Sequence, residues 1–438
     1  MISTFDHAVA LCGGGPAGIG PLIAAAQTGR LDKLLDKGVL LIEPARAGAG
    51  SMAHYRIRAN SLGRAFLECL ELLPPEPFGG LHDLPETTEL RRHADEYPPL
   101  AVVASFLDRL GEVVTGMLAA HPACRVVRGL VKEIHLLPDG ARVRVDASSG
   151  LLTTTVGQAV IATGGRPMAD FRRTSVVGDL TLDRYADKLS HSESLLDLRR
   201  PMPPEQMRAI RQSGHAAVVG GAHSAWAVAA LLLADPELRG PAGEPPMVTI
   251  LHRSPVRLFY LSARHADADN YPFDPQSDVC PASGRINRFG GLRGPAFDLA
   301  RAALGLAGAP VPVSLVDVSV DEPVVRAAAI AALDAAGAVI VATGYEANLP
   351  RIIGEDGAEL VAACSPTGTV VTSQTQLLDQ HGTVHPQLLA FGLGAGLPPS
   401  DAVGGESSYH RRADGVWLYQ NDIGHIVLDQ LLAGLSLR

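Results

Sequence analysis

Two strand–turn–helix segments with glycine-rich turns constrain the fold most strongly. The first, at residues 7–27, reads HAVALCGGGPAGIGPLIAAAQ, and the second, at residues 215–234, reads HAAVVGGAHSAWAVAALLLA. A short apolar strand, a tight glycine turn and a helix form the unit that binds dinucleotides, because the phosphates rest on the helix N-terminus. Two such units in one chain predict an α/β protein with two Rossmann-like dinucleotide-binding domains.

The first turn has the complete fingerprint Gly13-x-Gly15-x-x-Gly18. The first glycine permits the tight turn, the second lets the backbone approach a pyrophosphate, and the third lets the helix pack on the strand. The next apolar strand, GVLLIEPA, ends in Glu43, where a carboxylate accepts hydrogen bonds from a ribose diol. This pairing of turn and carboxylate predicts a dinucleotide site.

The second turn is degenerate, because Ala222 stands where the second glycine is expected after Gly220. The strand that follows, MVTILHRSP, carries Arg253 and Ser254 where the first unit has Glu43. A guanidinium grips a ribose 2′-phosphate bidentately, whereas a carboxylate repels it. Arg253 alone therefore favours NADPH over NADH; a structural turn and a solvent-facing arginine are the alternatives.

Composition excludes several classes of protein. The net charge of −9 argues against nucleic-acid binding and against a polybasic membrane anchor. The five cysteines are too far apart for a metal site or a disulfide-reductase redox pair, so we expect reduced thiols and no metal. Without a signal peptide or an apolar run of spanning length, a cytoplasmic protein is expected. The sequence leaves a homo-oligomer open.

Between the two units, residues 125–164 alternate through the turns PDG and SSG and end in the strand AVIATGG. This predicts an antiparallel meander followed by a buried strand. The order of elements resembles the FAD domain of the glutathione-reductase-like flavoproteins. The resemblance implies FAD in the first site, with the backbone of Val131 against the adenine. We expect an FAD domain at residues 1–205 and 341–438, into which an NADPH domain at residues 206–340 is inserted.

A narrower resemblance concerns the segment after the second domain, Ala342-Thr343-Gly344-Tyr345 with Pro350 after a four-residue gap. It is similar to the Ala-Thr-Gly-Tyr-x4-Pro signature of class B flavoprotein monooxygenases of the N-hydroxylating branch, the lysine and ornithine N-hydroxylases. HSESL, from His191, resembles their His-Ser-x-x-Tyr element, with Leu195 in place of the tyrosine. The sequence lacks the Baeyer–Villiger fingerprint.

This resemblance implies a reaction. NADPH reduces FAD, dioxygen adds at the flavin C4a to give a hydroperoxide, NADP+ shields it from water, and one oxygen atom passes to a small amine. The amine must be neutral to react, so its pocket is expected to lower the amine pKa by desolvation. An NADPH-dependent flavoprotein reductase or oxidase without oxygen insertion remains the alternative, and a redox-sensing flavoprotein a weaker one.

The flavin-centred chemistry leaves the catalytic side chains unassigned, with His54, Arg58 and Asn60 as candidates near the ring or, alternatively, parts of an edge strand. The polar loop at residues 261–295, which includes His265 and Asn287, either contacts NADPH and substrate or is solvated. The expected cofactor-binding residues are Gly13, Gly15, Pro16, Ala17, Gly18, Glu43, Val131, Ala162, Thr163, Gly164, Gly220, Ser224, Ala225, Arg253, Ser254, Ala342, Thr343, Gly344, Tyr345 and Gly394.

Overall fold

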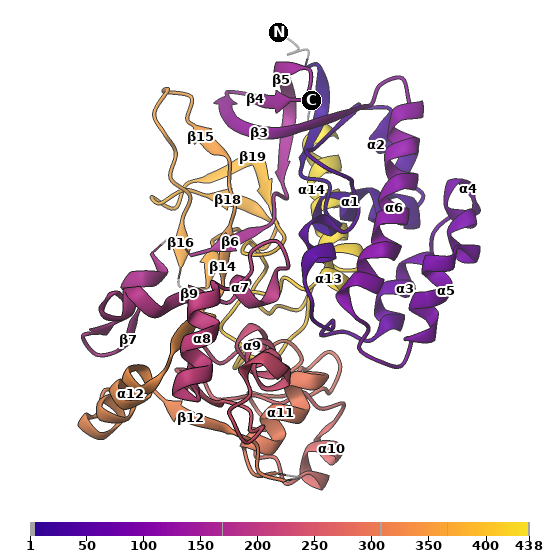
Figure 1. Ribbon diagram of the computed structural model, residues 1–438. Helices are drawn as coiled ribbons and strands as arrows, with labels where there is room; N and C mark the ends of the chain where they lie inside the picture. Colours follow the sequence, from indigo (N-terminus) through magenta and orange to yellow (C-terminus); the bar gives the residue numbers. More distant parts are fainter. Residues whose placement is uncertain (1–4, 169, 307–308, 366, 437–438) are drawn as a thin grey trace.

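The structure is a computed structural model that describes residues 5–168, 170–306, 309–365 and 367–436. Two sheets dominate it, and Figure 1 shows the larger above the smaller. Each sheet is built around one of the glycine-turn units predicted from the sequence, so the α/β class with two Rossmann-like units is confirmed.

The larger sheet has a parallel layer in the order β3-β2-β1-β5-β19. β1 and β2 are buried almost throughout, which explains their continuous apolar sequence. The C-terminal part of β3 and the N-terminal part of β5 extend beyond this layer. Both pair antiparallel with β4, which gives the predicted meander. The strands of this sheet are β1 (His7–Cys12), β2 (Val39–Glu43), β3 (Arg125–Leu137), β4 (Gly140–Ala147), β5 (Gly150–Ile161), β15 (Arg351–Ile353), β18 (Gln376–Leu378) and β19 (Val384–Ala390).

Helices cover the parallel layer. The apolar α1 packs beside α14 and α13, although these helices come from opposite ends of the chain (Figure 1). Their buried side chains join one core with β1, β2 and β5. The helices of this half are α1 (Pro16–Gln27), α2 (Leu31–Leu35), α3 (Gly63–Glu71), α4 (Pro75–Phe78), α5 (Pro85–Arg92), α6 (Leu100–Ala120), α13 (Val416–Gln420) and α14 (Ile423–Ser436), with 3₁₀ turns η1 (Gly50–His54) and η2 (Gly79–Asp83).

The smaller sheet is parallel, in the order β12-β11-β10-β13-β9. Its strands are β9 (Leu189–His191), β10 (His215–Val219), β11 (Met247–His252), β12 (Val313–Asp317) and β13 (Ala338–Val341). β9 lies before residue 206, where the sequence placed the start of the second domain, yet it hydrogen-bonds to β13 in this sheet. The helices of this half are α7 (Glu193–Leu196), α8 (Pro204–Ser213), α9 (His223–Ala234), α10 (Ala263–Ala268), α11 (Pro295–Ala303) and α12 (Pro323–Ala335).

A short antiparallel ribbon joins the two halves. β6 (Gly165–Pro167) follows the end of β5, β14 (Tyr345–Ala347) follows the end of β13, and the two pair residue by residue. The Arg166 Nε lies 2.8 Å from the Glu346 Oε1 across the ribbon. The ends of the two central strands are therefore held next to each other.

Short two-stranded ribbons and 3₁₀ turns lie outside the two sheets. The two remaining ribbons pair β7 with β8 and β16 with β17. Among the described residues, no helix combines the length and apolarity needed to cross a membrane. These elements are β7 (Ser175–Val177), β8 (Leu180–Thr181), β16 (Cys364–Ser365), β17 (Gly368–Thr369), η3 (Phe171–Arg173), η4 (Leu182–Lys188) and η5 (Pro236–Leu238).

Two glycines of α6 offer a matched test of its packing. A Cβ on Gly111 would lie 2.1 Å from the Ala47 carbonyl oxygen, whereas a Cβ on the exposed Gly116 would contact nothing within 4 Å. We expect Gly111→Ala to lower the free energy of unfolding by about 1–3 kcal/mol through overpacking. Gly116→Ala should raise it by about 0.5–1 kcal/mol through helix propensity. Thermal unfolding of the parent protein and the two variants ranks their stabilities. Equal unfolding midpoints would contradict this packing.

Candidate cofactor and active site

The first glycine turn is shaped by close backbone contacts. Gly13 has a φ of +109°, and a Cβ there would lie 2.3 Å from the Ala162 carbonyl oxygen. A Cβ on Gly18 would lie 1.8 Å from the Gly13 carbonyl oxygen. The Ala162 N–H donates to the Cys12 carbonyl at 2.8 Å, which ties the ends of β1 and β5 together. Side chains larger than hydrogen are therefore excluded at both positions.

The same turn leaves room where a dinucleotide's phosphates would lie. A Cβ on Gly15 would touch only the Gly50 Cα, at 3.7 Å. Gly15 caps α1, no side chain caps its N-terminus, and Pro16 is the first helical residue. The free N–H groups and the dipole of such a helix end favour an anion. The geometry of the turn therefore fits a pyrophosphate.

Glu43 ends β2 directly beside this turn. Its Oε2 accepts the Gly14 N–H at 2.7 Å, and its Oε1 accepts the Ala45 N–H at 3.0 Å. These bonds fix the carboxylate at the carboxyl edge of the sheet, next to the glycines. This is the place that the fingerprint requires for a ribose contact.

The glycine-rich segment after β19 closes over the first turn. A Cβ on Gly392 would lie 3.1 Å from the Ala17 Cβ, and a Cβ on Gly394 would lie 2.3 Å from the Glu346 carbonyl carbon. The Gly394 N–H donates to the Asp414 Oδ2 at 3.4 Å. The segment thus packs against both the N-terminal end of α1 and the inter-domain ribbon.

Asp414 is a residue of the site that was not predicted from the sequence. Burial raises the pKa of Asp414 to about 6, although the Gly394 N–H and Arg411 oppose the rise. A buried carboxyl with a perturbed pKa beside a ligand cradle is typical of a functional site. The sequence signal was an Asp-Gly pair at the start of α13, downstream of the glycine-rich segment.

The second glycine turn repeats the first. Gly220 has a φ of +133°, and a Cβ there would lie 2.3 Å from the Ala342 carbonyl oxygen. The Ala342 N–H donates to the Val219 carbonyl at 2.8 Å, as Ala162 does to Cys12. Ala222 caps α9 without a side-chain hydrogen bond. The turn is therefore a backbone cradle of the same kind despite the missing glycine.

The strand end beside this cradle carries the predicted arginine. Arg253 is exposed just beyond β11, and its Nη2 donates to the Ser175 carbonyl. The neighbouring Ser254 accepts a hydrogen bond at its carbonyl from the His252 Nδ1 at 3.0 Å. Ser224 and Ala225 lie in the first turn of α9. An exposed guanidinium at this edge has the freedom to contact a phosphate.

Aromatic and titratable side chains gather where the two cradles meet. The Tyr345 and His191 rings lie 5.9 Å apart, and Phe171 lies 5.7 Å from His191 on another side. Burial, with Arg200 nearby, lowers the pKa of His191 to about 4, so this imidazole is neutral at pH 7. Burial raises the pKa of Tyr345 to about 12. We call His191, Tyr345 and Phe171 the junction cluster.

Hydrogen bonds to the Glu193 carboxylate lie next to the junction cluster. The Tyr55 hydroxyl donates to the Glu193 Oε1 at 3.1 Å, and the Arg200 Nη1 donates to the Glu193 Oε2 at 2.6 Å. Tyr55 follows η1, so the loop after η1 contacts this region. Glu193 was not predicted as a site residue, and its signal in the sequence was its place within HSESL.

Other predicted residues lie outside the two glycine turns themselves. Val131 is buried on β3, three residues beyond Arg128, which pairs with Glu43 of β2, and Arg58 and Asn60 are exposed on the loop after η1. Asn287, considered as a ligand contact, is buried, and its Nδ2 donates to the Leu258 carbonyl and the Tyr271 hydroxyl at 3.0 and 3.2 Å. Asn287 therefore stabilises its own loop. The five cysteines are free thiols.

Comparison with known proteins gives one close relative. The chain is 44% identical over 434 residues to the CMP-5′-(3-aminopropyl)phosphonate hydroxylase of Streptomyces rubellomurinus, and the match covers 98% of each chain. No protein-family model matches the chain.

Solved structures share the fold at low identity. The ornithine N-hydroxylase of Kutzneria sp. 744, with reduced FAD, NADP+ and L-ornithine, matches with a TM-score of 0.52 at 16% identity and 98% and 99% coverage of the two chains. The ornithine hydroxylase of Pseudomonas aeruginosa matches with a TM-score of 0.54 at 13% identity, and the match covers 98% of this chain and 99% of that structure. The FAD-bound cadaverine monooxygenase of Erwinia amylovora matches with a TM-score of 0.53 at 12% identity, and the match covers 100% of this chain and 95% of that structure.

The raised pKa of Asp414 predicts a pH-dependent stability. Its pKa is higher when folded (about 6) than when unfolded, so its favourable contribution is full below pH 4 and is lost as pH rises through 6. Relative to Asp414→Asn, the parent protein should therefore lose about 2 kcal/mol of stability between pH 4 and pH 8. The melting temperatures of both FAD-loaded proteins, measured from pH 4 to pH 8, show this loss of stability. A constant difference between them would contradict a buried, protonated Asp414.

Proposed function

The chain belongs to the hydroxylase family of the Streptomyces rubellomurinus enzyme, and from this premise we propose that it N-hydroxylates the primary amine of an aminoalkylphosphonate carried on a nucleotide. The family and the shared fold of FAD-bound N-hydroxylases bear out the flavin-dependent monooxygenase that the sequence predicts. Its cofactors are FAD and NADPH. When bound, the flavin takes hydride from NADPH and activates dioxygen, which is the part of the reaction that no side chain can supply.

The arrangement of the two cradles is the observation that carries this proposal. β6 leaves the first Ala-Thr-Gly turn, β14 leaves the second, and Tyr345 pairs with Pro167 between them. The Thr163 Oγ1 also donates to the Asn348 carbonyl at 2.5 Å. Two dinucleotides held by these turns would meet at the ribbon. This proximity suits direct hydride transfer between them.

In this proposal, residues 1–205 and 341–438 bind FAD, and residues 206–340 together with β9 bind NADPH. The predicted cofactor residues keep their roles: the glycines of both turns hold pyrophosphates, Glu43 holds a ribose and Arg253 holds the 2′-phosphate. Gly394 and Asp414 close the FAD site. The free cysteines fit a reducing compartment such as the cytoplasm.

The junction cluster provides the setting for the amine. An amine can attack an electrophilic oxygen only through its lone pair, so it must first lose its proton. The neutral His191 has no negative charge to stabilise an ammonium, and the burial of His191 and Tyr345 would remove much of the ammonium's hydration. Such an environment lowers the pKa of an amine by desolvation. The cluster also excludes water from the reacting groups.

Replacing Arg253 tests the assignment of the nicotinamide cofactor. Arg253→Ala removes the charge-assisted contact to the 2′-phosphate, so the KM for NADPH should rise about tenfold or more. The KM for NADH, which lacks this phosphate, should not change, and neither should the FAD content. Steady-state NADPH and NADH oxidation by the two proteins give these values. An unchanged KM for NADPH would remove Arg253 from the site.

Substrate coupling tests the proposed reaction. The enzyme is supplied with NADPH, air and one of three amines: CMP-5′-(3-aminopropyl)phosphonate, 3-aminopropylphosphonate or L-ornithine. We expect the nucleotide-linked amine to yield a hydroxylamine in amounts that match the NADPH consumed, and the other two to yield mainly hydrogen peroxide. Mass spectrometry and peroxide assays give both quantities. Peroxide as the sole product from all three amines would instead indicate an oxidase.

A further inference from the structure

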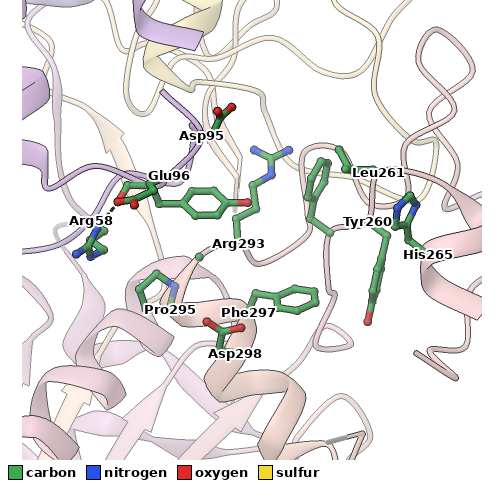
Figure 2. A pocket seen from close by; sticks show the side chains of 13 residues that line it. Arg58, Asp95, Glu96, Tyr260, Leu261, His265, Arg293, Pro295, Phe297 and Asp298 are labelled. Carbon is green, nitrogen blue, oxygen red and sulfur yellow. Dashed lines mark hydrogen bonds between the residues drawn. The ribbon is translucent and has the colours of Figure 1, made fainter. Parts of the chain in front are cut away.

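A cleft of about 550 Å³ lies between the two halves of the protein, outside both glycine turns. One wall is formed by Arg58 and residues 95–97 of the first half, and the other by residues 259–261, His265 and residues 293–298 of the second half (Figure 2). The volume falls within the range of small-molecule sites. None of the predicted cofactor-binding residues lines it.

Arg293 is an enclosed cation in this cleft; its Nη2 donates to the Arg288 carbonyl, and the Glu406 carboxylate is near enough to favour its charge. The Arg293 guanidinium carbon lies 4.1 Å from the centre of the Phe259 ring, and its Nη1 donates to the Asn60 carbonyl at 3.3 Å. Among the described residues, Arg293 has no ion pair and its Nε has no hydrogen-bond partner. Burial lowers the pKa of Arg293 to about 10, so it is still charged at pH 7. An anion entering the cleft would compensate this charge.

A second arginine faces the same space. Arg58 is exposed, and its Nη1 donates to the Tyr97 carbonyl at 2.7 Å. It makes no ion pair with any residue that the structure describes. Arg58 lies on the wall formed by the first half and Arg293 on the wall formed by the second half, and Figure 2 shows both above Pro295 and Asp298. Two guanidinium groups without ion pairs suit a ligand with adjacent phosphorus-centred anions.

The wall that carries Arg293 is also aromatic, and it carries a carboxylate without an ion pair. The Tyr260 and Phe297 rings meet edge to face at 5.4 Å between centroids. Such rings, together with Phe259, offer surfaces on which a nucleobase stacks. Asp298 lies in the first turn of α11 and has no ion pair within the described ranges. A carboxylate of this kind accepts hydrogen bonds from a ribose diol. Asp95, by contrast, is paired with Arg64 at 2.6 Å.

The cleft adjoins the second cofactor cradle. The backbone N–H of Arg293 donates to the His223 Nε2 at 3.2 Å, and His223 is the first residue of α9. Burial lowers the pKa of His223 to about 3, so it stays neutral and accepts this bond. On the other wall, Arg58 lies three residues after Tyr55, which supports the junction cluster through Glu193. A ligand in the cleft would thus have one end directed toward the junction.

We propose that this cleft holds the nucleotide portion of the substrate, an inference that rests on the proposed function. Arg293 and Arg58 bind the phosphate and phosphonate, the Phe259, Tyr260 and Phe297 rings bind the cytosine, and Asp298 binds the ribose diol. The aminoalkyl chain extends from the phosphonate toward the junction cluster. The nucleotide is then a handle whose binding energy places the amine.

The test uses CMP as the probe and the enzyme loaded with FAD and saturated with NADP+. Isothermal titration should show that CMP binds the parent protein, and that Arg58→Met and Arg293→Met each weaken this binding about tenfold or more. Asp298→Asn should reduce the preference for CMP over 2′-deoxy-CMP. Arg142→Met removes an exposed arginine of β4 outside the cleft and should leave CMP binding unchanged.

Arg58 and Asp298 are exposed, so their variants keep the test valid if Arg293→Met does not fold. Failure of CMP to bind the parent protein, or equal CMP binding by the parent, Arg58→Met and Asp298→Asn proteins, would overturn the proposal. So would a rise in the KM for NADPH in these variants equal to the loss of CMP affinity, which would assign the cleft to NADPH. CMP binding with the expected pattern, but without hydroxylation of any amine, would support the cleft and refute the proposed function.

Discussion

The pairing of β6 with β14 is the constraint on which the rest of the structure depends. Each strand leaves the Ala-Thr-Gly end of a central parallel strand, so their three paired positions bring the carboxyl edges of two separate sheets together. Ligands of open α/β sheets bind at these edges. The Asn348 N–H, which donates to the Gly164 carbonyl at 2.8 Å, continues the connection beyond the ribbon. In the proposed function, this arrangement brings the electron donor next to the electron acceptor.

The local elements of this architecture could be predicted from the sequence. Residues 7–12, 39–43 and 215–219 are strands because continuous apolar runs are buried on both faces, and the glycine turns follow from φ values that other residues rarely adopt. The family was also predicted correctly, from Ala342-Thr343-Gly344-Tyr345. These signals lie within a few neighbouring residues, so tertiary packing is not needed to recognise them.

The sequence could not reveal features that depend on distant segments. β9 joins the second sheet through hydrogen bonds to a strand about 150 residues later, and Arg293 reaches Asn60 across the domains. Asp414 acquires its raised pKa only because the folded chain buries it, and the Gly394 N–H opposes this rise. Neither Asp298 nor Phe259 belongs to any motif. Their grouping in one cleft results from the packing of the two halves, and this cleft is where we place substrate specificity.

The central claim is that the enzyme inserts oxygen from dioxygen into a nucleotide-linked amine. The most direct measurement is a turnover of CMP-5′-(3-aminopropyl)phosphonate with NADPH under ¹⁸O₂, followed by mass spectrometry of the product. The expected product is a hydroxylamine that carries one ¹⁸O atom. A product that carries oxygen from water, or unchanged amine with all of the label in hydrogen peroxide, would contradict it.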